Sequence, residues 1–218
     1  MTGFAEVTST DRAALMGGAP ACETVQDIIN IAATAEAFAV TALGGALANA
    51  ASGKLALNAM QRQVVTAARA EEQAHYAFLT AAGARPLTTT FTVPNPKIVT
   101  DVPTFLLTVI SLEEAFIAAY LAAAQEFAVL GRPRLAQLAL QIGGVEAEHR
   151  AGLRFFAIQA GIISGTPNDV AFEKALFSSV GAAANALKSL GFIGGTGTQI
   201  TYPGPSAIDN SGVTYLRP

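Results

Sequence analysis

Residues 145–150 read Val-Glu-Ala-Glu-His-Arg, and they place His149 three residues after Glu146. The other histidine of the chain repeats this arrangement, because His75 follows Glu72 by three residues. Residues three apart on a helix lie on one face, so each pair offers a carboxylate and an imidazole to the same point. Two such Glu-x-x-His pairs predict a metal site that is built between helices.

The composition favours one soluble helical domain. The chain has 218 residues, of which 51% are hydrophobic and 13% are charged. This length and apolarity allow a well-buried core and exclude a disordered chain. Abundant alanine is typical of tightly packed helices, so the expected fold class is all-α. A net charge of −3, without a cluster of Lys or Arg, argues against nucleic acid as a partner.

Hydrophobic periodicity divides the chain into five predicted helices. We expect four long helices over residues 23–51, 55–82, 103–130 and 134–160, and a shorter fifth helix over 168–190. Asn168 is the expected N-cap of the fifth helix, and Gly191 follows its end. The predicted organisation is an N-terminal arm at 1–22, a bundle at 23–161, an accessory helix at 162–190 and an extended tail at 191–218.

The connection between the second and third helices decides the topology. It is rich in Thr and Pro and runs from residue 84 to residue 102. A helix of about 28 residues is about 42 Å long, whereas a connection of about 19 residues reaches roughly 60 Å. The connection can therefore run the length of the bundle. Two antiparallel hairpins joined by one long crossover form a ferritin-like four-helix bundle.

This topology predicts six inward-pointing ligands, one glutamate from each of two helices and one Glu-x-x-His pair from each of the other two. The candidates, in chain order, are Glu36, Glu72, His75, Glu113, Glu146 and His149. Glu113 is preferred to its neighbour Glu114 because it shares a helix face with apolar residues and with Tyr120. We expect Tyr120, Glu114 and Arg150 to surround the ligands, and Glu71, Glu114 and Glu148 remain alternatives for a ligand position.

Four carboxylates inside an apolar bundle need compensation for a charge of about −4, because each unpaired buried ion costs several kcal/mol. Two divalent cations would supply it. The alternative is a set of protonated carboxyl groups without metal. Glu and His ligands without Cys favour iron or manganese over copper or structural zinc. The expected cofactor is therefore a pair of iron or manganese ions.

The sequence around these residues also resembles a known family. The resemblance is carried by residues 27–30 leading to Glu36, by residues 72–82, by residues 112–120, and most specifically by residues 144–154 (Gly-Val-Glu-Ala-Glu-His-Arg-Ala-Gly-Leu-Arg). These segments look like those of the ferritin-like desiccation-related proteins of plants and bacteria, over about residues 25–160. The resemblance implies the same six ligands. It departs at Leu43, where relatives often have an aromatic residue, and in the lack of a recognisable export signal.

Two functions follow as expectations. The first is a di-iron or di-manganese protein that acts on O2 or peroxide, as an oxidase or in a catalase-like manner, or that handles iron in stress protection. The second is a non-catalytic protective assembly protein in which the tails hold subunits together. A homo-oligomer is expected for both functions. We expect no membrane span, because no uncharged apolar run reaches about 18 residues. Without a signal peptide the expected location is cytoplasmic, with export of a processed precursor as the alternative.

Overall fold

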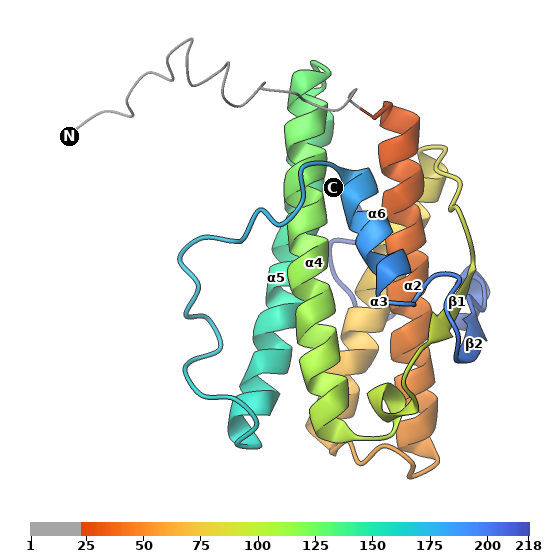
Figure 1. Ribbon diagram of the computed structural model, residues 1–218, viewed down its shortest axis with the longest axis vertical. Helices are drawn as coiled ribbons and strands as arrows, with labels where there is room; N and C mark the ends of the chain where they lie inside the picture. The colour runs from red at the N-terminus through yellow and green to blue at the C-terminus, as the bar shows by residue number, and fades with distance from the viewer. Residues whose placement is uncertain (1–22) are drawn as a thin grey trace, which may run out of the picture.

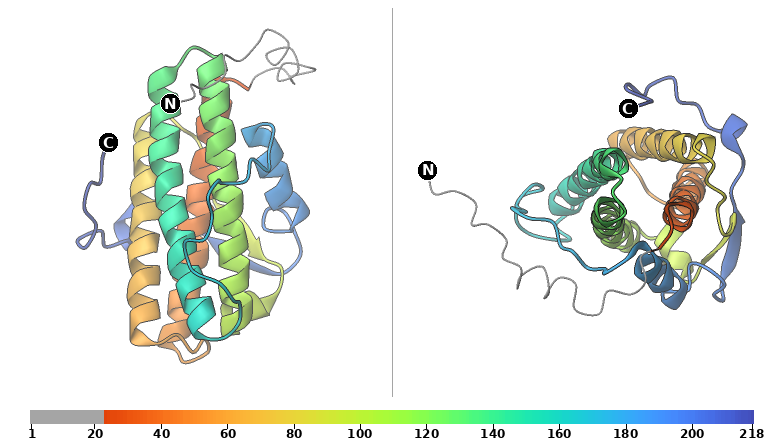
Figure 2. Two further views of the ribbon diagram at one scale, coloured as in Figure 1. Left: turned by 90° about the vertical axis from the view of Figure 1, so that its left-hand side faces the viewer. Right: turned by 90° about the horizontal axis from the view of Figure 1, so that it is seen from above.

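The computed structural model describes residues 23–218, and its fold is all-α (Figure 1). The predicted arm at 1–22 lies outside the described residues. Five α-helices are present in the described part of the chain: α2 (Val25–Ala51), α3 (Ala59–Ala81), α4 (Val102–Val129), α5 (Pro133–Gln159) and the short α6 (Val180–Ser189). The four long helices form a bundle, and α6 lies outside it (Figure 2).

Local capping sets where α2 and α3 begin. The side chain of Thr24 accepts a hydrogen bond from the backbone N–H of Asp27, and the side chain of Asp27 accepts one from the backbone N–H of Thr24. Asn58 and Gln61 form the same capping box before α3. The second helix therefore begins at residue 59, four residues later than its apolar pattern predicted. A capping box satisfies backbone N–H groups that have no partner inside the helix.

The two hairpins, α2 with α3 and α4 with α5, are joined by a crossover that runs along the outside of the bundle. The crossover holds strand β1 (Thr90–Val93) and the 3-10 helix η1 (Pro96–Val99). Asn49 on α2 donates a side-chain hydrogen bond of 2.8 Å to the backbone oxygen of Val99. The expected ferritin-like connectivity is thus observed, with the crossover tied to the first helix.

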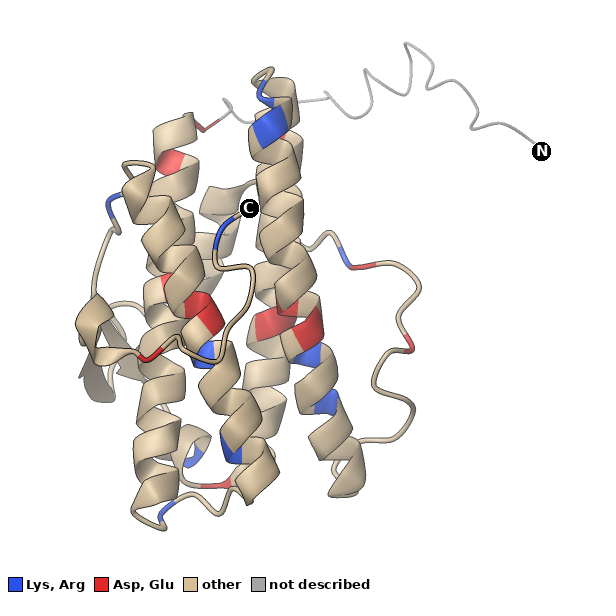
Figure 3. Ribbon diagram, turned by 180° about the vertical axis from the view of Figure 1, so that it is seen from behind, with Lys and Arg blue, Asp and Glu red and all other residues tan. Residues whose placement is uncertain are grey.

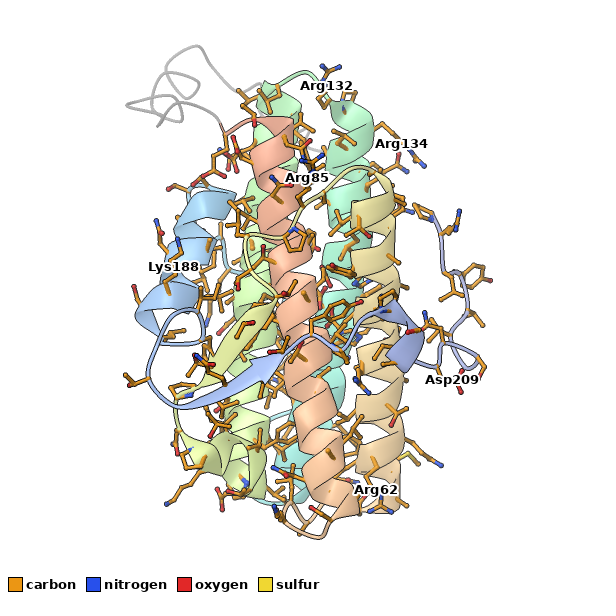
Figure 4. The ribbon with its side chains drawn as sticks, turned by 90° about the vertical axis from the view of Figure 1, so that its right-hand side faces the viewer. Arg62, Arg85, Arg132, Arg134, Lys188 and Asp209 are labelled. Carbon is orange, nitrogen blue, oxygen red and sulfur yellow. The ribbon has the colours of Figure 1, made fainter. Side chains whose placement is uncertain are left out.

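The C-terminal tail adds strand β2 (Thr198–Thr201) and the 3-10 helix η2 (Pro205–Ala207). β2 pairs antiparallel with β1, in a register that places Phe91 opposite Ile200. Figure 4 shows β2 and the following chain crossing over α2 and α3, with Asp209 beyond α3. Phe91 is fully buried and its ring lies 5.4 Å from that of Phe38 on α2. The sheet was not predicted, and it packs the crossover and the tail onto the bundle.

The prediction of a fifth helix over 168–190 was wrong at its start. The helix α6 begins at Val180, and its N-cap is Ser179 rather than Asn168. Between α5 and α6 the chain runs irregularly along the bundle and is held by ion pairs. They join Arg150 to Glu173, Arg154 to Asp169, and Lys174 to Glu114. The end was predicted correctly, since Gly191 has the positive φ of +82° that commonly follows a helix.

Helices α2 and α4 are long and apolar enough to cross a membrane by length and composition, but 56% of the relevant window of each is buried inside the bundle. Each also carries a buried glutamate, Glu36 on α2 and Glu113 on α4. The core helices of a bundle pass the same test, so these features give little support to a membrane span.

Candidate metal centre

The six predicted ligands lie together at mid-height of the bundle. α2 provides Glu36, α3 provides Glu72 and His75, α4 provides Glu113, and α5 provides Glu146 and His149. Figure 3 shows acidic residues gathered at this level on neighbouring helices. All four glutamates are at most 2% exposed, and His149 is 7% exposed. The bundle therefore places six ionisable side chains in its core.

Their ligand atoms form two groups, in each of which one atom from every residue lies within 4.8 Å of the others. The first group is Glu36, Glu72, His75 and Glu146, and the second is Glu72, Glu113, Glu146 and His149. Glu72 and Glu146 belong to both. Two adjacent positions for a cation are thus defined, with two carboxylates shared between them.

The shared carboxylates point one oxygen at each histidine. Oε2 of Glu72 lies 3.6 Å from Nδ1 of His75, and Oε1 of Glu72 lies 3.2 Å from Nδ1 of His149. Glu146 does the same, with Oε1 3.6 Å from Nδ1 of His75 and Oε2 3.3 Å from Nδ1 of His149. Glu36 completes the first position at 3.4 Å from Nδ1 of His75. A carboxylate that spans two positions in this way has bridging geometry.

The same atoms are buried without hydrogen-bond partners. Within residues 23–218, the side-chain atoms of the cluster that have none are Glu36 Oε2, both carboxylate oxygens of Glu72 and Glu146, Glu113 Oε2, and Nδ1 of His75 and His149. Buried polar atoms are otherwise almost always paired. Oxygen and imidazole nitrogen atoms that converge without partners fit a pair of divalent cations, so the residues present match a di-metal group.

Without metal, bound protons must offset the negative charge of the clustered carboxylates. Burial, followed by the nearby charges of Glu146 and Glu72, raises the pKa of Glu113 well above its ordinary value, although His149 opposes the shift. Burial and Glu72 also raise the pKa of Glu146. Burial would lower the pKa of both histidines, but the surrounding carboxylates outweigh it and raise the pKa of His75 and His149 well above the usual value. The cluster thus retains protons that a cation would displace.

Two neighbours orient the cluster. The hydroxyl of Tyr120 on α4 donates a hydrogen bond to Oε1 of Glu36 on α2. On the other side of the cluster, Nε2 of His149 lies 2.7 Å from Oε2 of Glu71. Because Nδ1 of His149 faces the shared carboxylates, the Glu71 contact fixes the ring in the orientation that a metal ligand needs. The sequence left Glu71 among several acidic alternatives, because no pattern of neighbouring residues predicts a contact between α3 and α5.

The expectation that Glu114 and Arg150 surround the ligands was wrong. Glu114 lies next to Glu113 in sequence, but its Oε1 is 2.7 Å from Nζ of Lys174 at the surface. Arg150 is buried and donates two hydrogen bonds, of 2.6 and 2.7 Å, to the carboxylate of Glu173. Successive helical residues point about 100° apart, which turns both side chains away from the cluster and towards the 160–179 segment.

A polar cavity of about 600 Å³ reaches the cluster from the side of α3 and α5. Its lining includes Glu71, His75, Glu148 and the last residues of the chain, 213–218. The side chain of His75 is 13% exposed, whereas those of Glu36, Glu72 and Glu146 are at most 2% exposed. Small solutes therefore have a route to the cluster past His75.

Comparison with known proteins agrees with this geometry. The family model described as a ferritin-like domain matches residues 21–159, which include all four long helices and all six clustered residues. No curated protein and no solved structure matches the chain.

Proposed function

The chain belongs to the ferritin-like domain family, and from this premise we propose that its buried cluster binds two iron or manganese ions that act on O2 or peroxide. The observation that carries the proposal is the convergence of buried carboxylate oxygens and imidazole nitrogens that lack other partners. Oxygen and imidazole donors without thiolate suit iron and manganese.

Each ion would have its own set of ligands. Glu36 and His75 would hold one ion, Glu113 and His149 the other, and Glu72 and Glu146 would bridge the two. The four carboxylates would carry about −4 charge when ionised, which two divalent ions would balance. An uncompensated buried charge costs several kcal/mol, so binding would also stabilise the fold.

Bound iron or manganese would supply the electrons for reducing O2 or peroxide. The contribution of the chain is to hold, orient and shield. Tyr120 fixes Glu36 through its hydroxyl, and Glu71 fixes His149 through Nε2. The apolar bundle keeps bulk water away from the buried carboxylates, while the polar cavity beside His75 admits small solutes. This route past His75 suits a small oxidant better than a large substrate.

The biological role in this proposal is protection against oxidative or desiccation stress by a soluble cytoplasmic homo-oligomer, which is supported by the resemblance to desiccation-related ferritin-like proteins. A second candidate is a protective assembly protein in which the metals only lock the bundle. Exposed apolar side chains on the segment before α6 favour it, since Phe172 is 90% exposed and Leu176 is 49% exposed. Exposed apolar residues that lie close together often mark interaction sites.

Elemental analysis of protein purified without added metal or chelator tests the proposal. We expect about two Fe or Mn per chain in the wild type, as the two four-residue groups imply. Glu146→Gln, which removes a shared ligand, should lose most of the metal. Glu148→Gln changes an exposed carboxylate on the same helix and should retain it. Equal metal content in the two variants, or none in the wild type, would reject the assignment.

Catalytic turnover distinguishes the two proposed functions. The metal-loaded wild type should disproportionate peroxide to O2 and water in excess of its metal content, or consume O2 in excess of it when ascorbate is added as the reductant, whereas Glu146→Gln should do neither. Protein that binds two metals without any turnover, and whose thermal stability falls when metal is removed, would support the assembly role.

A further inference from the structure

A second cavity is lined in part by Tyr120, whose hydroxyl donates to Glu36, and most of its lining is apolar. It has a volume of about 240 Å³ and lies between α2, α4 and α6, partly open to solvent, with residues 87 and 88 of the crossover at its rim. Its walls include Ile31 and Ala35 on α2, Ala119 on α4, and Ala183 and Leu187 on α6. In Figure 1, α6 lies on the outside of the bundle beside α2 and α4, and residues of α6 line the cavity.

Small side chains leave the space open. Most of the α4 and α6 residues that face it are alanines, so the two helices meet without filling the volume between them. Protein interiors are packed as densely as organic crystals, and voids larger than a water molecule are few. An apolar pocket of this size is therefore unusual, and it leaves room for an occupant.

Water is a poor occupant. The hydroxyl of Thr34 donates to the backbone oxygen of Asn30 and accepts from the backbone N–H of Leu87. The hydroxyl of Tyr120 donates to Glu36. Both of these hydroxyl groups are thus engaged, the hydroxyl of Thr88 is paired with the backbone of Thr90, and Lys188 is exposed at the edge. An internal water needs two to four polar partners. A closed apolar cavity of about 150 Å³ binds benzene, so a volume of about 240 Å³ has room for a molecule of at least that size.

We propose that the cavity binds a small apolar molecule, about the size of a single aromatic ring with a short alkyl substituent. The ligand packs against Tyr120, whose hydroxyl donates to Glu36 of the metal cluster. None of the walls of this site is a metal ligand, and Tyr120, which positions Glu36, is the residue that the site shares with the surroundings of the cluster. It gives the protein an apolar binding site on one side of the cluster and a polar access route on the other.

The experiment is a titration of the purified full-length protein with toluene, followed by thermal unfolding and by NMR of methyl groups. Binding to the native state raises the unfolding temperature with ligand concentration. We expect saturable stabilisation of the wild type and concentration-dependent shifts of the methyl signals of Ile31 and Leu187. Methyl groups remote from the cavity, such as those of Val64, should not shift.

A pair of neighbouring substitutions supplies the control. Ala183→Leu fills the cavity and should weaken toluene binding at least tenfold. Ala182→Leu adds the same atoms to the same helix outside the lining and should bind like the wild type. Ala119→Leu fills the cavity from α4 and gives the same test if α6 does not tolerate the first change. The proposal is overturned if the wild type shows no saturable effect, or if the filled and control variants bind equally.

Discussion

The hydroxyl of Tyr120 donates a hydrogen bond to Oε1 of Glu36, which joins α4 to α2 across the core of the bundle. The other carboxylate oxygen of Glu36 has no hydrogen-bond partner within residues 23–218 and points towards Nδ1 of His75 at 3.4 Å. One oxygen of Glu36 is thus committed to the protein, and the other is left for a cation. The tyrosine therefore acts as a positioning residue for one end of the cluster.

Tyr120→Phe should lower the free energy of unfolding of the metal-free protein by about 1–3 kcal/mol, because it leaves a buried carboxylate oxygen without its donor. Chemical denaturation in the presence of chelator measures this change. Tyr76→Phe is the matched control, since no hydrogen bond from the Tyr76 hydroxyl is present among the described residues. An equal effect in the two variants would mean that the Glu36 contact contributes nothing.

Glu71→Gln should weaken metal binding without abolishing it. The carboxylate of Glu71 lies 2.7 Å from Nε2 of His149 and orients the ring. Loss of such a partner typically costs 10–100-fold in metal affinity. Competition with a chelator of known affinity measures the change, and Glu148→Gln serves as the control because its carboxylate is exposed on the same cavity wall. Unchanged affinity in Glu71→Gln would contradict an orienting role.

Two adjacent glutamates on α4 give a sharp comparison. Glu113 is 2% exposed and belongs to the second ligand group, whereas Glu114 is paired with Lys174. Glu113→Gln should reduce the metal content by about one ion per chain, and Glu114→Gln should leave it unchanged. The stability of Glu114→Gln should fall by at most about 1 kcal/mol, as is usual for an exposed ion pair. Elemental analysis and thermal unfolding report both effects.

The parts of this structure that are local in sequence could be predicted, and the parts that depend on distant contacts could not. Glu146 and His149 share a helix face by their spacing alone, and the apolar periodicity revealed the four long helices. The start of the fifth helix was misplaced because Asn168 is a residue type that often caps a helix, whereas the observed cap is Ser179 and Glu173 before it is drawn to Arg150 on α5. That ion pair fixes an irregular path that no local pattern records.

The small sheet could not be predicted for the same reason. Each strand has only four residues, which is too short for a clear alternation of apolar and polar side chains, and the partners Phe91 and Ile200 lie far apart in sequence. The contact between Glu71 and His149 likewise depends on how α3 meets α5. The ligands could therefore be predicted from helical spacing, but not the side chains that orient them.

The carboxyl group of Glu126 should make the free energy of unfolding fall as pH rises above about 4.5, the ordinary pKa of a glutamate. Burial raises the pKa of this carboxyl above its ordinary value, while the hydrogen bond of 2.9 Å from the backbone N–H of Val180 opposes the shift. A raised pKa in the folded state means that the protonated form favours folding. This contribution is complete below the unfolded-state pKa and is lost as pH rises through the folded-state pKa.

Glu126→Gln removes this titration and keeps an oxygen that accepts from Val180. The difference in unfolding free energy between the wild type and this variant should change with pH in the range above about 4.5, in favour of the variant at higher pH. Denaturation curves at several pH values in chelator measure the difference. A difference that is constant with pH would show that Glu126 titrates alike in both states.

The end of the chain should control how fast metal leaves the cluster. Residues 213–218 form part of the wall of the polar cavity through which His75 is reached. Removing them by ending the chain at Gly212 leaves β2 and the hydrogen bond of 2.6 Å from Tyr202 to Gln73 in place. The fold should therefore persist, with an unchanged unfolding temperature in chelator, while the route past His75 becomes wider.

The expected result is a several-fold faster loss of metal to a chelator, with the same metal content at equilibrium, because the ligands themselves are untouched. Stopped-flow or absorbance measurements of chelator complex formation report the rate. A chain in which 213–218 are replaced by a Gly/Ser segment of equal length separates the effect of the side chains from that of the backbone. If ending the chain at Gly212 leaves the rate unchanged, metal exchange is limited by ligand release within the bundle, and the tail is only a surface feature.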